Sequence, residues 1–248
     1  MLADQPDGLL RVGNFVCGWK GTMAEGTDVV IPAGTKGIAD ETFSHCGAMA
    51  SVVLPEGLEW IGISAFGECV GLTSLSLPTT LRRIDPMAFV SCSHLTGNVT
   101  IPSGVKEIAN GAFFDCGKLT SVTIADGVET IATGAFLNCS SLTNAVIPES
   151  VTKIGLQAFA ATGLKTVVLP GGLTKIEEGA FDNCALVSVT IPAGVVSIDR
   201  GAFYNCTALT KIVFRGTKAQ WAAIPKGENW NLDVPATVVH CSDGDVAL

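Results

Sequence analysis

Cysteine is the residue type in this sequence with the clearest potential for chemistry, because a thiolate can act as a nucleophile or hold a metal ion. The chain of 248 residues contains nine cysteines, and no two of them have the Cys-x-x-Cys spacing that is typical of metal sites. Seven cysteines share one position, three residues after a phenylalanine. They are Cys46, Cys69, Cys92, Cys116, Cys139, Cys184 and Cys206.

Such regular spacing predicts a column of stacked, buried side chains rather than a site at which ligands converge. Parallel side chains in a column point the same way, which suits disulfide bonding poorly, so we expect reduced structural thiols. The alternative, a disulfide framework, is typical of short secreted chains. Cys17 and Cys241 lie near the two ends of the sequence, outside the column.

The other polar residues form no recognisable catalytic or metal-binding motif. The three histidines have unrelated surroundings, and the serines recur at one repeated position, which indicates scaffold rather than a nucleophile. Asp243-Gly244-Asp245 lacks the further acidic positions of a calcium loop, and we expect the chain from Asp243 to Leu248 to be frayed. The sequence therefore predicts no catalytic residues, no metal site and no cofactor, so it does not predict an enzyme.

Three sets of residues recur in one register and define a repeat. The first set is phenylalanine, the second is an aliphatic residue usually followed by proline, and the third is the cysteine, which Thr162 replaces once. About eight units of 22–24 residues fit between residues 26 and 214. The phenylalanines are Phe43, Phe66, Phe89, Phe113, Phe136, Phe159, Phe181 and Phe203.

One unit, residues 119–139, shows how each repeat should fold. Residues 119–124, with the sequence LTSVTI, alternate and are rich in β-branched residues, which predicts a strand. The proline that follows in most units cannot donate to a sheet ladder, and Pro-x-Gly predicts a turn. Residues 128–131 form a second extended piece, and Gly134-Ala135-Phe136 then makes a tight turn that places its phenylalanine inside.

One coil cannot bury its own apolar side, whereas stacked coils can. The sequence therefore predicts a mostly β solenoid with little helix. A parallel β-sheet forms one face, and short 3₁₀ or helical turns and extended segments form the other. Residues 1–25 and 215–248 do not fit the repeat, and we interpret them as an N-terminal cap and a C-terminal cap with tail. A short helix is expected over residues 218–224, with Trp221 and Trp230 covering the open core.

Charge and hydropathy exclude several classes of partner. The net charge is −8 and the longest basic run is Arg82-Arg83, which argues against nucleic-acid binding. No apolar run reaches the length of a membrane span, so no membrane insertion is expected. The first residues lack a basic start and an uninterrupted apolar stretch, so we expect no signal peptide or anchor within this sequence.

The repeat Leu-Thr-Ser-Val-Thr-Ile, Gly-Val-x-x-Ile and Gly-Ala-Phe-x-x-Cys resembles the BspA-like, or Treponema pallidum-type, leucine-rich repeat. The resemblance covers about residues 26–214 and implies a leucine-rich-repeat solenoid. It also implies a bacterial or protozoan protein, surface-exposed or secreted, that adheres to host proteins or to other cells. The family supplies no catalytic residues.

Outward positions of the strands are the candidate ligand face, because solenoid faces commonly bind partners. The same hydroxyl-rich surface is equally consistent with a solvated sheet. Its residues are Thr73, Ser74, Ser76, Thr120, Ser121, Thr123, Thr143, Asn144, Lys165, Thr166, Thr210 and Lys211. Trp60 is a second candidate contact if it is exposed, and the plainer interpretation is that it packs on the next coil.

Two functions remain open from the sequence. The first is a non-enzymatic interaction module, an adhesin or recognition domain at a bacterial surface or secreted, that binds host or neighbouring-cell proteins. The second is a rigid spacer or receptor-binding element of a surface or phage tail-fibre assembly. The sequence defines neither the partner nor the oligomeric state.

Overall fold

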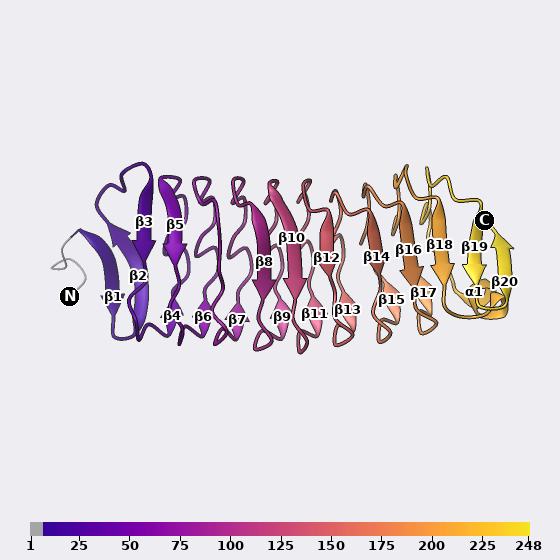
Figure 1. Cartoon of the computed structure of the whole chain (residues 1–248), viewed down its shortest axis with the longest axis horizontal. Helices are drawn as coiled ribbons and strands as arrows, with labels where there is room; N and C mark the ends of the chain where they lie inside the picture. Colours follow the sequence, from indigo (N-terminus) through magenta and orange to yellow (C-terminus); the bar gives the residue numbers. More distant parts are fainter. Residues whose placement is uncertain (1–6) are drawn as a thin grey trace.

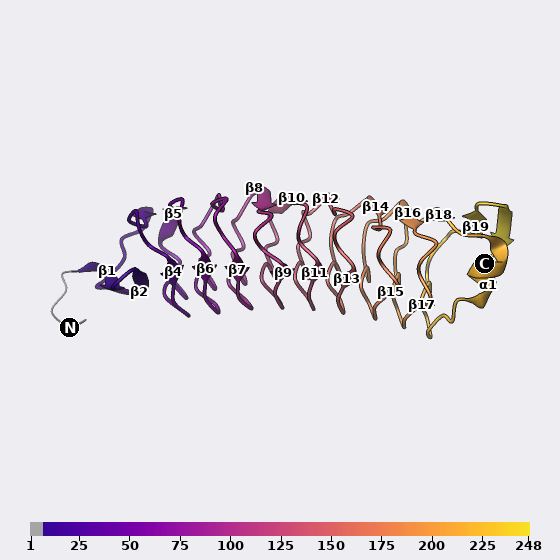
Figure 2. The same cartoon turned by 90° about the horizontal axis from the view of Figure 1, so that it is seen from below.

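The computed structural model describes residues 7–248 as a rod of stacked coils (Figure 1). The chain makes about ten turns around one axis, and the two ends of the described chain lie at opposite ends of the rod. Figure 2 shows that each coil lies directly beside the next. The solenoid predicted from the sequence, mostly β with parallel sheets and almost no helix, is confirmed.

The longer strands follow one another along one side of the rod, which we call the strand face. Equivalent residues of neighbouring coils pair in parallel within three separate sheets, so that Val122 lies between Val99 and Ala145. Residues 72–78, which carry Thr73, Ser74 and Ser76, follow the same side of the rod without forming a strand. Alternation places Leu119, Val122 and Ile124 in the core, as predicted. The strands are β3 (Thr27–Val30), β5 (Met49–Val53), β8 (Gly97–Ile101), β10 (Leu119–Ile124), β12 (Asn144–Val146), β14 (Thr166–Val168), β16 (Ser188–Ile191), β18 (Lys211–Phe214) and β19 (Val238–Cys241).

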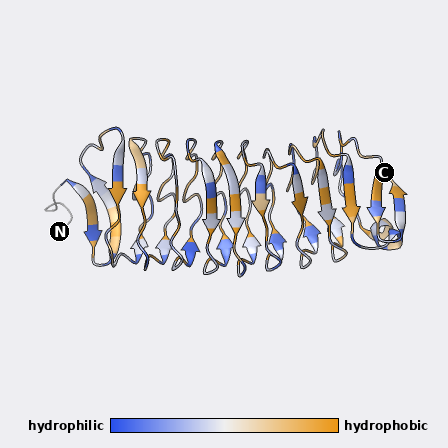
Figure 3. Ribbon diagram, in the orientation of Figure 1, coloured by the Kyte–Doolittle hydropathy of each residue, from blue (hydrophilic) through white to orange (hydrophobic). Residues whose placement is uncertain are grey.

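A second set of parallel strands, each only two residues long, runs along the back of the rod. The isoleucine of every strand points inward and is buried. Polar residues usually precede it, and they colour most of these short strands blue or white in Figure 3. The strands are β4 (Gly37–Ile38), β6 (Trp60–Ile61), β7 (Arg83–Ile84), β9 (Glu107–Ile108), β11 (Thr130–Ile131), β13 (Lys153–Ile154), β15 (Lys175–Ile176) and β17 (Ser197–Ile198).

The phenylalanines form a continuous stack through the core. All eight are fully buried, and neighbouring rings lie nearly parallel with centroids 5.2 to 5.7 Å apart. Trp230 ends the stack by meeting Phe203 edge to face at 6.4 Å. Each ring therefore fills one coil and also covers the ring of the preceding coil, which is why a single repeat could not fold alone.

The turns that carry the phenylalanines form a third hydrogen-bonded ladder, and this ladder runs in one direction. The Phe43 N–H donates to the Ala65 carbonyl of the next coil (2.8 Å), and the pattern continues to the Phe203 N–H, which donates to the Trp230 carbonyl (2.8 Å). Throughout the described chain these segments are hydrogen-bonded turns, without the regular 3₁₀ geometry that the sequence allowed. We call this side of the rod the turn face.

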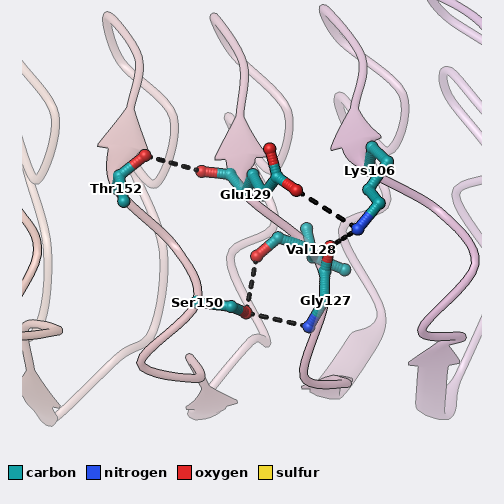
Figure 4. A network of polar contacts seen from close by, with 6 residues as sticks. All are labelled: Lys106, Gly127, Val128, Glu129, Ser150 and Thr152. Atoms are coloured by element: carbon teal, nitrogen blue, oxygen red, sulfur yellow. Dashed lines mark hydrogen bonds and ion pairs between the residues drawn. The ribbon is translucent and has the colours of Figure 1, made fainter.

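Side-chain hydroxyls connect the turns that follow the longer strands, on the remaining edge of the rod (Figure 4). Ser150 Oγ accepts from the Gly127 N–H (3.0 Å) and donates to the Val128 carbonyl (2.7 Å), so one hydroxyl satisfies two backbone groups of the preceding coil. Thr80 makes the same two bonds, to the Gly57 N–H and the Leu58 carbonyl, three coils closer to the N-terminus. Lys106 Nζ completes the network by donating to the Gly127 carbonyl at 3.1 Å.

The predicted cysteine column is present, and its thiols form hydrogen bonds with the backbone. Six buried thiols each donate to the phenylalanine carbonyl of the preceding coil, with Sγ–O distances of 3.0 to 3.2 Å. Thr162, at the cysteine position of its own unit, donates instead to the Phe159 carbonyl at 2.8 Å. All nine cysteines are free.

Burial keeps the thiols in the middle of the column, those of Cys92, Cys116 and Cys139, protonated. It raises the pKa of Cys92 and that of Cys139 to about 12, and it raises the pKa of Cys116 well above the ordinary value. The thiolate is the nucleophilic and metal-binding form of cysteine. The column therefore acts as packing and as a set of hydrogen-bond donors at neutral pH.

A hairpin begins the rod. Strands β1 (Gly8–Val12) and β2 (Phe15–Lys20) pair antiparallel, and β2 continues in parallel with β4, so the hairpin extends the back sheet. Val16 of β2 is fully buried against the first coil. The open end of the back sheet is thereby covered by a strand of reversed direction.

At the other end, the backbone continues the coil although the sequence motif stops. Helix α1 (Lys218–Ala223) begins at a capping box in which the Thr217 hydroxyl accepts from the Gln220 N–H and the Gln220 side chain accepts from the Thr217 N–H. Trp221 and Trp230 are buried over the end of the core. Strand β19 then pairs in parallel with β18.

The prediction that residues 243–248 are frayed is wrong. Strand β20 (Gly244–Ala247) pairs antiparallel with β19. Asp243 Oδ1 accepts from the Lys218 N–H at 2.7 Å, and Asp245 Oδ1 lies 2.9 Å from His240 Nδ1. The acidic Asp-Gly-Asp sequence is therefore the turn of a closing hairpin, stabilised by α1 and by β19.

The hydroxyl network predicts a measurable loss of stability in Ser150→Ala. The substitution leaves the Gly127 N–H and the Val128 carbonyl without this partner, so we expect the free energy of unfolding to fall by about 1–2 kcal/mol. Urea unfolding followed by circular dichroism measures it. Ser103→Ala is the control, because Ser103 is exposed and shows no side-chain hydrogen bond within residues 7–248. An equal loss in both variants would contradict the role of Ser150.

The cysteine column predicts instability at high pH. Unfolded thiols ionise near pH 9.0, whereas folded Cys92 and Cys139 have a pKa of about 12. The stabilisation is thus complete below pH 9.0 and is lost progressively as the pH rises towards 12, by about 1.4 kcal/mol per pH unit for each thiol. Urea unfolding across this range checks the slope. The Cys92→Ala/Cys139→Ala variant should show a shallower slope, and an unchanged slope would refute the explanation.

Candidate functional site

The predicted ligand residues lie in three rows along the strand face, all exposed or half-exposed. The repeat brings equivalent positions side by side, one coil apart. The first row contains Thr73, Thr120, Thr143, Lys165 and Thr210, the second contains Ser74, Ser121, Asn144, Thr166 and Lys211, and the third contains Ser76 and Thr123.

Three hydroxyls of the first row bond to the backbone of the scaffold. Thr73, Thr120 and Thr143 each donate to a backbone carbonyl of the preceding coil, at 3.3, 3.0 and 3.4 Å. In the second row, the Asn144 amide donates to Ser121 Oγ at 3.4 Å. These contacts support the solvated-sheet interpretation for part of the predicted face.

The third row is different because β-branched apolar residues share it. Val30, Val53, Val146 and Val168 are 60%, 55%, 50% and 53% exposed. Figure 3 shows apolar colour near the ends of β3, β5 and β14, where three of these valines lie. The strand face therefore combines a hydroxyl-rich centre with an exposed apolar margin, which is a surface suited to a partner chain.

Trp60 packs along the back of the rod instead of projecting from it. Its indole Nε1 donates to Asp85 Oδ2 (2.6 Å), the Arg83 guanidinium lies 5.7 Å from the ring centroid, and the Phe15 ring meets it edge to face at 6.1 Å. A Cβ on Gly37 would lie under 3 Å from both aromatic rings. The indole thus fills the space that the glycine leaves.

Asp85 is the residue of this cluster that the sequence did not single out. It is buried, and it accepts from Trp60 and from Arg83 Nε (2.5 Å). Most other units have alanine or glycine directly after the back-strand isoleucine. That departure from the repeat, paired with the unusual tryptophan, is the signal that would have found it.

Charged residues on the back of the rod pair between neighbouring coils. Lys36 lies 2.7 Å from Glu59, and Lys106 lies 3.2 Å from Glu129. Both pairs are exposed, so water screens them and they add little to stability. Within residues 7–248, no group of three or more His, Cys, Asp and Glu side chains is placed to hold a metal ion, and no helix is long and apolar enough to cross a membrane.

Comparison with known proteins agrees with this geometry. The sequence-family model of the BspA type leucine-rich repeat region matches residues 22–143 and 130–221, in six copies. No curated protein matches the chain. A leucine-rich cell surface protein from Faecalibacterium prausnitzii A2-165 is 32% identical, with a TM-score of 0.55, over 80% of this chain and 62% of its own.

A leucine-rich repeat protein from Bacteroides ovatus ATCC 8483 has the same fold at 21% identity, with a TM-score of 0.60, over 84% of this chain and 64% of its own. The chain thus spans less than two thirds of the length of either protein. The matched residues include most of the coils, with all eight stacked phenylalanines and the cysteine column. The chain belongs to the BspA-type leucine-rich repeat family.

Proposed function

We propose that the chain is a non-enzymatic protein-interaction module of a bacterial cell surface or secreted protein, an adhesin or recognition domain. It binds an extended segment of a host or neighbouring-cell protein along the strand face. The observation that carries the proposal is the row of half-exposed valines beside the hydroxyl rows.

Two further observations support this proposal. The fold is one that typically binds proteins, and the F. prausnitzii relative is described as a cell surface protein. The sheet also offers side chains at a regular coil-to-coil interval, which suits a partner that lies along several coils. The hydroxyls of Ser74 and Thr166 show no hydrogen-bond partner among residues 7–248 and can bond such a partner, whereas the threonines that bond to the backbone contribute surface shape.

Introducing charge into the apolar margin should abolish binding. Val146→Glu/Val168→Glu desolvates two carboxylates against an apolar contact, so we expect affinity to fall at least tenfold, about 1.4 kcal/mol. The measurement is capture of host extracellular-matrix proteins and mucins on the immobilised chain, followed by titration of the captured partner.

Val196→Glu is the matched control, because Val196 is 65% exposed but lies outside the strand face, just before β17. It should bind as the unmodified chain does. Capture that survives in the double variant, or that is lost in both variants, would place the contact elsewhere.

The second candidate is a rigid spacer or a receptor-binding element of a surface or phage tail-fibre assembly. The uninterrupted phenylalanine stack, which stiffens the rod from Phe43 to Phe203, favours it. If none of the extracellular-matrix proteins and mucins binds the immobilised chain, the result would favour this structural role over recognition.

A further inference from the structure

A groove of about 370 Å³ crosses the turn face towards the C-terminal end of the rod. Gly179 and Gly201 line it at the position two residues before the phenylalanine, where the backbone is left-handed (φ of 60° at both). Gln157 and Asn229 occupy the same left-handed position in the coils before and after them (φ of 53° and 54°). Two successive glycines thus leave a hollow between two amide side chains; we call it the turn groove.

Four further residues of successive turns complete the turn groove. Asp182 and Tyr204 flank the glycines, and a Cβ on Gly201 would lie 3.6 Å from Tyr204 Cβ. Glu178 and Arg200 precede the glycines, and their charged atoms are 4.0 Å apart, so the guanidinium is only loosely paired. The turn groove brings one aromatic ring, two amides, two carboxylates and one guanidinium together from four coils.

The lining limits which ligand the turn groove can take. Its volume is within the range of small-molecule sites, but its walls are too polar for an apolar ligand. Two carboxylates against one loosely paired guanidinium disfavour phosphate and carboxylate ligands. Within the described chain, the side chains of Gln157, Asn229 and Tyr204 show no hydrogen-bond partner, so their donors and acceptors are available.

We propose that the turn groove is a binding site for a neutral saccharide of two or three sugar units. Sugar rings present hydroxyl groups around their rim, and amide and carboxylate side chains offer the paired donors and acceptors that match neighbouring hydroxyls. The Tyr204 ring supplies an apolar surface for the C–H face of a sugar together with a polar tip.

The chain contains its own comparison for this assignment. Gly111 and Gly134 form an equivalent pair of left-handed glycines (φ of 59° at both), but Phe114 and Leu137 stand where Asp182 and Tyr204 stand in the turn groove. The backbone is thus the same, and only the side chains differ. The saccharide site therefore depends on the polar residues of the later coils.

Nuclear magnetic resonance titration with cellotriose, maltotriose and N-acetylchitotriose tests the proposal. We expect at least one trisaccharide to bind with a Kd of about 1 mM or tighter, and to shift the backbone amide signals of Tyr204 and Asn229. Tyr204→Ala removes the ring. Gly201→Asn fills the floor with a residue type that the chain already carries in this conformation at Asn229. Each should weaken binding at least tenfold, about 1.4 kcal/mol.

Phe114→Ala and the strand-face variant Val146→Glu/Val168→Glu are the controls, and both should bind the saccharide unchanged. Thermal unfolding confirms that each variant is folded. The assignment is overturned if no trisaccharide binds, if Tyr204→Ala and Gly201→Asn bind as the unmodified chain does, or if only a lysine-rich peptide shifts the groove signals. These outcomes are independent of protein capture by the strand face.

Discussion

The distance between coils is the constraint on which the rest of the structure depends. Backbone hydrogen bonds between coils fix this step, and the stacked phenylalanine rings recur with it, with centroids 5.2 to 5.7 Å apart. The strands, the turn ladder, the thiols and the hydroxyls of Ser150 and Thr80 can all bond between coils because each recurs at the same step. Many of the residues that repeat are therefore tied to their neighbours by packing or by a hydrogen bond.

The bonds between coils distinguish residues that hold the rod together from residues that are available to a partner. From the sequence, threonines such as Thr120 are candidates for binding a ligand, but the Thr120 hydroxyl already donates to a carbonyl of the preceding coil. The residues that remain available are those that change from coil to coil, such as Val168 on the strand face and Tyr204 on the turn face. Recognition in such a rod must be built from departures from the repeat.

The sequence predicts the coils well because three independent residue columns report the same local geometry. It predicts the ends and the sites less well. β20 is a short strand with two acidic residues nearby, and only its pairing with the distant β19 makes it a strand. Asp85 is recognisable only beside Trp60 of the preceding coil. The turn groove needs side chains from four coils, which no single unit contains.

The hydrogen bonds between the turns that carry the phenylalanines all point the same way along the rod, so their dipoles add up. In the β-sheets, N–H groups point both ways and their dipoles largely cancel. In the turns, every inter-coil N–H donates towards the C-terminal end, from Phe43 to Asn205. The last turn therefore ends in backbone donors at Asn231 and Asp233, and the first begins with carbonyl acceptors at Thr42 and Ser44. Two like ends cannot continue each other's ladder, so any end-to-end contact through the turns must join unlike ends.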